Sequence, residues 1–395
     1  MYISLYNTNS INKSKREKSV VKLLFKNLLK NTDYIVLACV FILFIVGVVA
    51  IYSAGYATEV NKDEYIKQII WFGIVFVMMV VIWCIDYNTF DIFGYILYGI
   101  NLVLLVAVLF MPKLMGASSW FNLGGILYQP SELMKIGYII CSAKFFSILK
   151  NNVPKNDKRK KWIIVSILAL LVIIPVGLIM LQPDFGTAMV FLCVLAFMVF
   201  KSGIKYRYIF ACIGIALIML PLFYFFILNP TQQERINVFI DPELDPLGSG
   251  YNAIQSKIAV GAGMLFGTGL LNGAQTQYGY LPIKSTDFIF SVISEEMGFL
   301  MSVFIVIVYA ILIIRLLRIA KNARDDFSSF MVIGITGMIF FHFVENIGMT
   351  IGLLPITGVP LPFVSYGGSS LITSGMAIGI ALNVSARKSK NVFLD

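Results

Sequence analysis

The sequence is poor in the side chains that most metal and nucleophile sites use. It contains one histidine, His342, and its five cysteines lie singly within apolar stretches. Clusters of histidine ligands are therefore excluded, and the cysteines are typical of small core residues without metal-ligand spacing. Ser365 has neither a G-x-S-x-G context nor a histidine nearby in sequence, which argues against a serine nucleophile. The default role of His342 is a place in the core or a hydrogen bond to a helix.

The chain also lacks a phosphate loop and internal repeats. The glycines between Gly261 and Gly273 follow no strand and precede no Walker lysine, so they indicate close packing of short helices. No fixed-period repeat or low-complexity tract is present. Nucleotide-loop enzymes and repeat proteins are therefore disfavoured.

Apolar residues dominate what is present. The 395 residues are 58% hydrophobic and only 13% charged, with a mean hydropathy of +0.85. This composition predicts an all-α, polytopic integral membrane protein, because a spanning helix needs about 20 apolar residues. We expect about ten spans: Tyr34–Tyr52, Ile66–Ile85, Phe93–Phe110, Leu133–Leu149, Trp162–Leu181, Thr187–Phe200, Ile209–Leu228, Phe288–Leu317, Phe330–Leu354 and Ser369–Val384.

The net charge of +10 is a topology signal. Basic clusters precede the first span and follow the fourth, sixth, eighth and last spans, which puts them all on one side of the membrane. The positive-inside rule makes that side, and both termini, cytoplasmic. The distribution favours contact with anionic lipid and argues against nucleic acid as a partner.

This topology predicts one membrane domain with two short tails. The basic segment 1–31 is cytoplasmic, residues 32–388 form the ten-span domain, and residues 389–395 are a cytoplasmic tail. A large external segment, about 229–286, separates spans seven and eight and is expected to hold short helices and loops. The first span resembles a signal peptide, but its apolar core is too long for one, so we expect a retained anchor.

The stretch from Leu281 to Phe299 places a lone carboxylate, Asp287, where a polar loop meets an apolar helix. We expect Ser285 or Thr286 to cap that helix, with Asp287 in its first turn. Helical spacing then puts Asp287 on one face with Ser291, Ser294 and Gly298. This polar and small stripe indicates a cavity or a tightly packed helix.

Four more charged residues map to the outer ends or outer halves of their helices: Glu132, Lys135, Asp184 and Glu345. Each has a structural explanation, since Glu132 and Lys135 at i, i+3 form a helix pair and Asp184 can cap a helix. Intramembrane charges are costly, however, and several helices place them at one membrane face. Shared depth therefore favours a functional site.

Glu295 and Glu296 invite comparison with a paired-carboxylate glycosidase site. Eight helical residues put Glu295 roughly 12 Å from Asp287 along the axis, beyond the ~5–9.5 Å that such pairs use. Glu296 faces away from Asp287 and is expected to contact another helix.

Five motifs in order resemble the SEDS family (shape, elongation, division and sporulation), and the resemblance extends from Asp33 to Val384. They are QPSELMK (129–135), QPDFGTA (182–188), DPLGSGYNAIQSKIAVGAG (245–263), LPIKSTDFIFSVISEEMGF (281–299) and NIGMTIGLLPITGVPLPFVSYGGSS (346–370). The GAQTQ before the fourth motif resembles the RodA type more than the FtsW type.

The resemblance implies a peptidoglycan glycosyltransferase that polymerises lipid II at the outer face of the bacterial cytoplasmic membrane and releases polyprenyl pyrophosphate. Asp287 matches the family's essential aspartate, and the supporting or pyrophosphate-binding residues are Glu132, Lys135, Asp184, Glu345 and Ser365. The implied partner is a class B penicillin-binding protein transpeptidase. A divalent metal ion (Mg or Mn) is allowed, and no organic cofactor is expected.

One position departs from the family pattern. Members often carry an arginine before the tryptophan of the GA-x-x-W segment, whereas this chain has Ser119 before Trp120. If that arginine holds phosphate, Arg235 or Lys113 must replace it, or the contact is dispensable.

Two other functions stay open at this stage. A flippase or transporter of the same lipid-linked precursor should place its polar groups near the midplane between repeats, whereas here they cluster outside. That difference favours the enzyme. A noncatalytic scaffold, and the choice among elongation, division and sporulation, are not decided by the sequence.

Overall fold

The computed structural model describes residues 28–56, 62–86, 89–112, 119–124, 126–154, 157–204, 214, 225–226, 233, 237–245 and 248–387. Most of the basic N-terminal segment, the tail from 388 and nearly all of the seventh predicted span lie outside these residues. So do Lys113 and Arg235, the two cations expected to replace the missing arginine.

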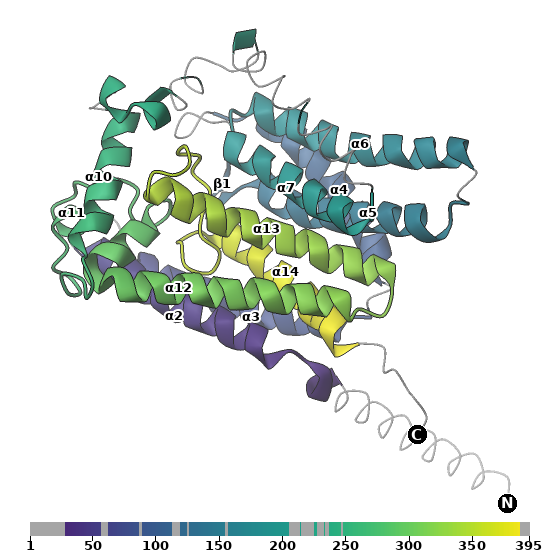
Figure 1. Ribbon diagram of the computed structural model, residues 1–395, viewed down its shortest axis with the longest axis horizontal. Helices are drawn as coiled ribbons and strands as arrows, with labels where there is room; N and C mark the ends of the chain where they lie inside the picture. Colours follow the sequence, from purple (N-terminus) through teal and green to yellow (C-terminus); the bar gives the residue numbers. More distant parts are fainter. Residues whose placement is uncertain are drawn as a thin grey trace, which may run out of the picture.

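Long helices running side by side form one bundle (Figure 1). They are α2 (Tyr34–Tyr56), α3 (Glu64–Cys84), α4 (Thr89–Val108), α5 (Pro130–Asn151), α6 (Lys158–Leu181), α7 (Phe185–Lys201), α12 (Ile289–Lys321), α13 (Asp326–Thr350) and α14 (Gly368–Ala386). In the described part of the chain, seven of them are long and apolar enough to cross a membrane; α7 is shorter. The prediction of an all-α, multi-pass membrane protein is confirmed, while the count of ten spans stays a prediction.

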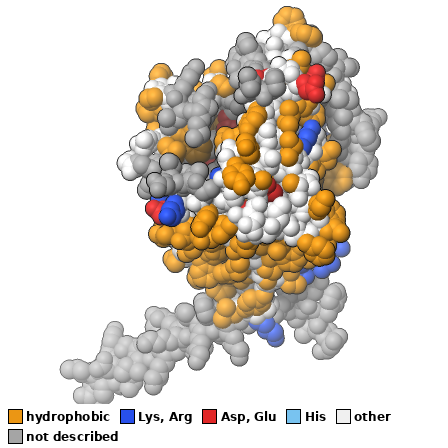
Figure 2. Space-filling model, turned by 90° about the vertical axis from the view of Figure 1, so that its left-hand side faces the viewer, with side chains coloured by type: hydrophobic (Ala, Val, Ile, Leu, Met, Phe, Trp, Pro, Cys, Tyr) orange, Lys and Arg blue, Asp and Glu red, His pale blue; other side chains and the backbone are white. Residues whose placement is uncertain are grey.

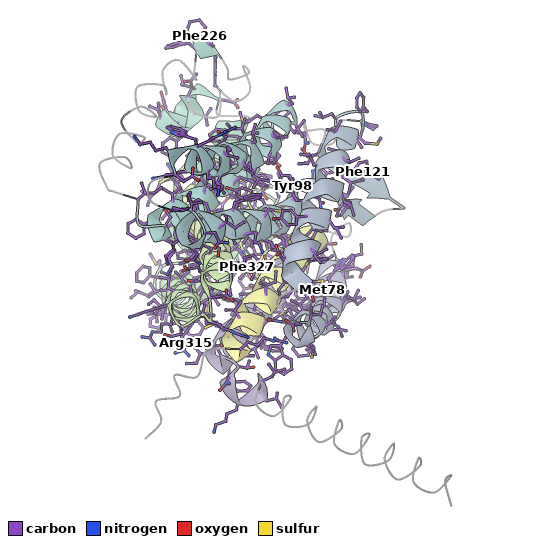
Figure 3. All side chains as sticks on the ribbon, turned by 90° about the vertical axis from the view of Figure 1, so that its right-hand side faces the viewer. Met78, Tyr98, Phe121, Phe226, Arg315 and Phe327 are labelled. Carbon is purple, nitrogen blue, oxygen red and sulfur yellow. The ribbon has the colours of Figure 1, made fainter. Side chains whose placement is uncertain are left out.

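Burial separates the central helices from the peripheral ones. Most residues of α13 and α14 are buried, whereas α3, α4 and α6 expose large apolar side chains such as Val77, Ile92 and Ile173. A helix that is apolar on all sides is typical of contact with lipid. Figure 3, which views the bundle from the end where Arg315 lies, shows side chains between the helices and around the outside.

The opposite end of the bundle carries the short elements (Figure 1). These are the antiparallel hairpin β1 (Phe121–Leu123) and β2 (Ile126–Tyr128), the 3₁₀ turn η2 (Pro242–Leu244), and the helices α10 (Ser249–Ala262) and α11 (Ala274–Gln277). Figure 2 faces this end and shows a few acidic and basic side chains among hydrophobic and uncharged ones.

At this end of the bundle, glycines allow the backbone of residues 263–268 to pack closely against the backbone of α12. Helix α12 is kinked at Gly298, where φ is 79° and ψ is −177°. The kink frees backbone groups, which pair with the glycine-rich segment: Thr268 N–H donates to the Glu295 carbonyl at 2.9 Å, and Phe299 N–H donates to the Met264 carbonyl at 2.8 Å. A Cβ atom on Gly263 would lie 1.7 Å from the Ser294 carbonyl oxygen. These contacts confirm close packing as the use of the glycines.

Candidate active site

An ion pair lies in the first turns of α5. Pro130 occupies the first turn, and the Lys135 Nζ atom lies 2.8 Å from Glu132 Oε1. Lys135 is 1% exposed and Glu132 is 4% exposed. Charges so deeply buried must be paired, because an unpaired one would cost several kcal/mol. The predicted i, i+3 pair is therefore present, and it lies inside the protein rather than on its surface.

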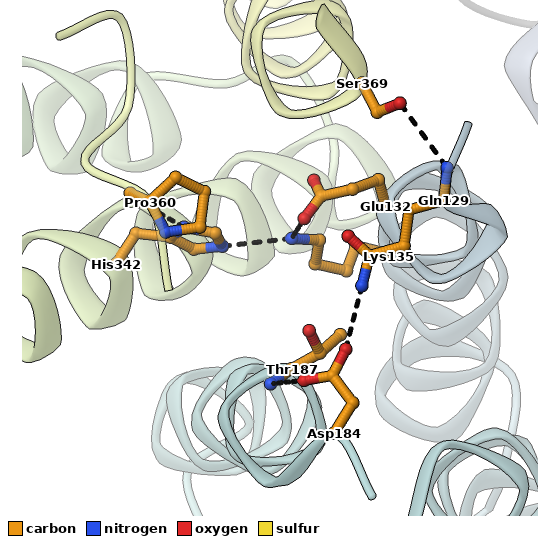
Figure 4. A network of polar contacts seen from close by, with 8 residues as sticks. All are labelled: Gln129, Glu132, Lys135, Asp184, Thr187, His342, Pro360 and Ser369. Carbon is orange, nitrogen blue, oxygen red and sulfur yellow. Dashed lines mark hydrogen bonds and ion pairs between the residues drawn. The ribbon is translucent and has the colours of Figure 1, made fainter. Parts of the chain in front are cut away.

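His342 joins this pair from α13. Its Nε2 atom lies 3.0 Å from Lys135 Nζ, and its Nδ1 atom lies 3.0 Å from the Pro360 carbonyl oxygen (Figure 4). We call Glu132, Lys135 and His342 the lysine cluster. His342 was expected only in the core or in a hydrogen bond to a helix, and not in the site. The available signal was its spacing from Glu345 and Asn346, which at i+3 and i+4 share its helix face.

Asp184 stands beside the lysine cluster in the turn between α6 and α7. It is the N-cap of α7, as predicted, and its Oδ1 atom accepts from Thr187 N–H at 3.1 Å. Gln129 Nε2 donates to Oδ2 at 2.8 Å, which ties this cap to the start of α5. Withdrawal from water raises the pKa of the Asp184 carboxyl, while the Thr187 hydrogen bonds and the Lys135 charge oppose that rise. The carboxyl thus links α7 to α5.

The chain between α13 and α14, residues 351–367, forms no helix and turns back into the protein. We call it the return loop. Val359 and Leu361 are 3% and 1% exposed, as expected of irregular backbone at membrane depth, which must be buried in protein. Thr357 Oγ1 donates to Glu345 Oε1 at 2.8 Å, and Asn346 Nδ2 donates to the Val359 carbonyl at 2.9 Å.

Asp287 lies before α12, not in its first turn. Helix α12 begins at Ile289, and its N-cap, Phe288, makes no side-chain cap bond, so the predicted Ser285 or Thr286 cap is wrong. The reason is that hydrogen bonds from the return loop and α13 hold the three backbone carbonyls before the helix. The Ser285 carbonyl accepts from Tyr366 N–H at 2.9 Å, and the Thr286 carbonyl accepts from Ser365 Oγ at 2.7 Å. The Asp287 carbonyl accepts from Asn346 Nδ2 at 2.9 Å.

The predicted stripe that joined Asp287 to the α12 serines is therefore wrong as well. Ser291 and Ser294 are buried, and their hydroxyls lie 2.7 Å and 2.9 Å from those of Ser256 and Ser302. Ser291 thus joins α12 to α10, whereas Ser294 and Ser302 bond to each other across the kink within α12. The Asp287 carboxylate instead faces the return loop: its Oδ2 atom lies 3.3 Å from the place a Cβ atom on Gly358 would take.

The return loop thus joins the predicted site residues. Within four consecutive positions, Thr357 contacts Glu345, Gly358 adjoins Asp287, Val359 contacts Asn346, and Pro360 contacts His342 of the lysine cluster. Helix α7 starts against the same stretch, since a Cβ atom on Gly186 would lie 2.9 Å from the Thr357 carbonyl oxygen. Ser365 Oγ donates to the Thr286 carbonyl at 2.7 Å and accepts from Leu361 N–H at 2.8 Å, so it ties the return loop to the backbone before α12.

Glu295 lies outside this group. Its Oε1 atom accepts from Gln275 N–H at 2.7 Å, and its Oε2 atom accepts from the N–H and hydroxyl of Thr276 at 3.0 Å and 2.6 Å. We call Glu295 with these donors the glutamate brace. Glu296 accepts from Gln277 Nε2 at 2.9 Å, which confirms its predicted contact with another helix, here α11. Both carboxylates bond α11 to α12.

Two predictions concern groups that would bind phosphate, a divalent metal ion and a cation in place of the family's arginine. Within the described ranges, no three His, Cys, Asp or Glu side chains gather closely enough to hold a metal ion. Ser119 is 1% exposed, and its Oγ atom lies 3.5 Å from the Gln182 carbonyl oxygen. The position of the family's arginine therefore adjoins the Asp184 turn.

Known proteins match nearly the whole chain. The family model described as cell cycle protein, covering FtsW, RodA and SpoVE, matches residues 33–390. The peptidoglycan glycosyltransferase RodA of Treponema pallidum is 34% identical and is matched over 98% of its length and 90% of this chain. The peptidoglycan glycosyltransferase MrdB of Escherichia coli K12 is 38% identical over 82% of its length and 78% of this chain.

Solved structures agree with these matches. A chain from a study of polymerisation and crosslinking by a peptidoglycan synthase complex is 31% identical, with a TM-score of 0.75, over 97% of its length and 90% of this chain. The rod shape determining protein RodA of Thermus thermophilus is 27% identical, with a TM-score of 0.65, over 98% of its length and 91% of this chain. The chain thus belongs to the FtsW, RodA and SpoVE family, the SEDS proteins.

Proposed function

We propose that this chain is a peptidoglycan glycosyltransferase that polymerises lipid II at the outer face of the cytoplasmic membrane. The observation that carries the proposal is the pair of charged groups at the return loop, with the Asp287 carboxylate beside Gly358 and the lysine cluster bonded to Pro360. A base and a cation held by one loop suit a reaction that moves a proton and expels an anion. Relatives named as peptidoglycan glycosyltransferases support the substrate class.

Asp287 is the general base in this proposal. As the acceptor sugar hydroxyl attacks the donor's anomeric carbon, the new C–O bond forms and the bond to the pyrophosphate oxygen breaks with its electron pair. The hydroxyl proton passes to the Asp287 carboxylate. The three tertiary hydrogen bonds on the carbonyls of Ser285, Thr286 and Asp287 fix the backbone that presents this carboxylate.

Lys135 stabilises the departing pyrophosphate. An ammonium has three N–H donors, and within the described residues two of them are used, by Glu132 and His342. The third can donate to a phosphate oxygen as negative charge develops there. Asp184 and Glu345 support this arrangement by bonding to Gln129 and Thr357, which lie in the α5 N-cap and the return loop.

The charge pattern supports an external site. Basic residues Lys150, Lys201, Arg318 and Lys321 lie at or near the ends of α5, α7 and α12, while Glu132, Asp184 and Asp287 lie at or before the starts of the same helices. By the positive-inside rule the basic ends and both termini are cytoplasmic and the site is external. Polar groups at helix starts also favour an enzyme over a flippase with a midplane site.

The partner in this proposal is a single-span class B penicillin-binding protein that cross-links the new strands. Its support is the similar chain from a peptidoglycan synthase complex. The membrane itself is the second partner, because lipid II is anchored there and the peripheral helices expose apolar side chains.

The test uses the purified full chain, the partner transpeptidase and lipid II. We expect native protein to make glycan polymer, and Asp287→Asn and Asp287→Ala to make none while keeping native thermal stability. Thr336→Val is the matched control, since the Thr336 hydroxyl is buried but bonds only within α13. Undiminished polymer in both Asp287 variants would refute the base, and lipid movement between leaflets without polymer would favour the flippase.

A further inference from the structure

His342 is the member of the lysine cluster to which the proposed reaction assigns no role. It is 3% exposed, and it is the only histidine of the chain. Its two ring nitrogens lie 3.0 Å from Lys135 Nζ and 3.0 Å from the Pro360 carbonyl oxygen. Each partner requires the ring nitrogen that it contacts to be either a donor or an acceptor, and together these two requirements fix the protonation state of the imidazole.

A backbone carbonyl can only accept a hydrogen bond, so Nδ1 must carry a proton to bond with Pro360. A protonated lysine can only donate, so Nε2 must present its lone pair to Lys135. The alternative, a neutral amine beside an imidazolium, holds the same number of protons. It is disfavoured because an amine binds a proton more tightly than an imidazole and because Glu132 lies 2.8 Å from the nitrogen. The imidazole is therefore the neutral Nδ1–H tautomer.

This tautomer limits where the ammonium can lie. Glu132 is on the same helix as Lys135, three residues earlier, and by itself would hold the ammonium along α5. His342 belongs to α13 and adds a second acceptor from another direction (Figure 4). Because Pro360 holds the other ring nitrogen, the position of the acceptor follows the same return loop that adjoins Asp287 at Gly358.

We propose that His342 is a positioning residue of the transferase, which as a neutral Nδ1–H imidazole aims the Lys135 ammonium and couples its position to the return loop. The inference rests on the proposed function, because the position of the Lys135 ammonium matters only if pyrophosphate leaves beside it. The leaving pyrophosphate must meet an N–H already aimed at it, since misplacement by about 1 Å costs on the order of 100-fold in rate. The acidic side chains that face this arrangement are Glu132, bonded to Lys135, and Asp184, which the Lys135 charge affects. Glu345 follows His342 by three residues on α13.

The single histidine permits a direct test of the tautomer. Full-length protein is labelled with ¹⁵N-histidine, its polyhistidine tag is removed, and the two ring nitrogens of His342 are observed by NMR at neutral pH. We expect a protonated Nδ1 and an unprotonated Nε2. In Lys135→Met the Nε2 signal should move toward that of a free acceptor while Nδ1 keeps its proton. An Nε2–H tautomer or an imidazolium in the native protein would overturn the proposal.

Turnover then tests the positioning role with two variants. Gln can replace both contacts, since its amide oxygen can accept from Lys135 and its N–H can donate to the Pro360 carbonyl, whereas Phe keeps the ring size but neither contact. We expect His342→Gln to retain activity within about five-fold, and His342→Phe to lose about 10–100-fold in kcat with KM changed less than about three-fold.

Equal activities in the two variants, whether high or low, would overturn the positioning role. The NMR measurement needs no turnover, so it separates this inference from the proposed function. A native chain that makes no polymer refutes the function, whereas an active native chain with an Nε2–H imidazole refutes only the inference about His342.

Discussion

The lysine cluster and the glutamate brace both bury a glutamate at the end of the bundle that carries the short elements, yet they use its oxygens differently. Glu295 accepts three hydrogen bonds, and both oxygens are occupied. Glu132 accepts one, from Lys135, and within the part of the chain that the structure describes its Oε2 atom has no hydrogen-bond partner. Buried polar atoms are normally bonded. Both oxygens of Glu295 are thus occupied, whereas Glu132 leaves one acceptor atom without a partner among the described residues.

At nearly equal burial, the hydrogen bonds that each carboxylate accepts distinguish Glu295, for which we expect a structural role, from Glu132, for which we expect a functional one. Glu295 is 0% exposed and Glu132 is 4% exposed, so burial alone does not distinguish them. Hydrogen bonds from main-chain N–H groups, as in the brace, hold a short helix against α12. A cation with an unused donor, as in the lysine cluster, suits an anionic leaving group. Four substitutions test this difference between the lysine cluster and the glutamate brace.

Lys135→Met has the largest expected effect among them. It removes the proposed pyrophosphate donor, and we expect polymerisation of lipid II to fall by at least about 100-fold. The single change also leaves Glu132 buried without its cation, which costs on the order of 3–5 kcal/mol. The double variant Glu132→Gln/Lys135→Met avoids that penalty, so it should unfold near the native temperature and remain inactive. Normal turnover in either variant would reduce the lysine cluster to a structural ion pair.

Ser365→Ala should have the next largest effect. Loss of the hydroxyl removes one of the three hydrogen bonds that hold the backbone before α12, while Asn346 still binds the Asp287 carbonyl. We expect kcat to fall about ten-fold, because the base is displaced but present, with KM little changed. Thr336→Val, which loses a buried hydroxyl elsewhere, should keep native kcat. Equal kcat values in these two variants would contradict the holding role of Ser365.

These contacts also mark the limit of what the sequence could predict. The helices and the Asp184 cap were predictable because long apolar runs and capping residues are local features. The place of Asp287 was not, since the hydrogen bonds that keep it out of α12 come from residues 59 and 79 positions away from their acceptors. His342 was missed for the same reason, because Lys135 is 207 positions away.

Glu295→Gln tests the expectation that the glutamate brace stabilises the fold and takes no part in the reaction. An amide retains one acceptor oxygen and presents N–H groups to donors, so the brace should lose at least one charge-assisted hydrogen bond. We expect the free energy of unfolding to fall by about 1.5–3 kcal/mol, seen as a lower unfolding temperature. Turnover per folded molecule should stay within about three-fold of native. A variant with native stability and no activity would show that Glu295 is needed for the reaction and not for stability.

Asp33→Asn should have the smallest effect and controls for burial of charge itself. Asp33 precedes α2 at the other end of the bundle, and its Oδ2 atom accepts from Arg315 at 2.9 Å and 2.6 Å. The amide can still accept at Oδ1 from Ile35 N–H, so the start of α2 is kept. Arg315 is 25% exposed and stays hydrated, so we expect a loss of about 1 kcal/mol in unfolding free energy and native turnover. If turnover fell as far as in Lys135→Met, removal of any buried charge would inactivate the protein, and the special role of the lysine cluster would be lost.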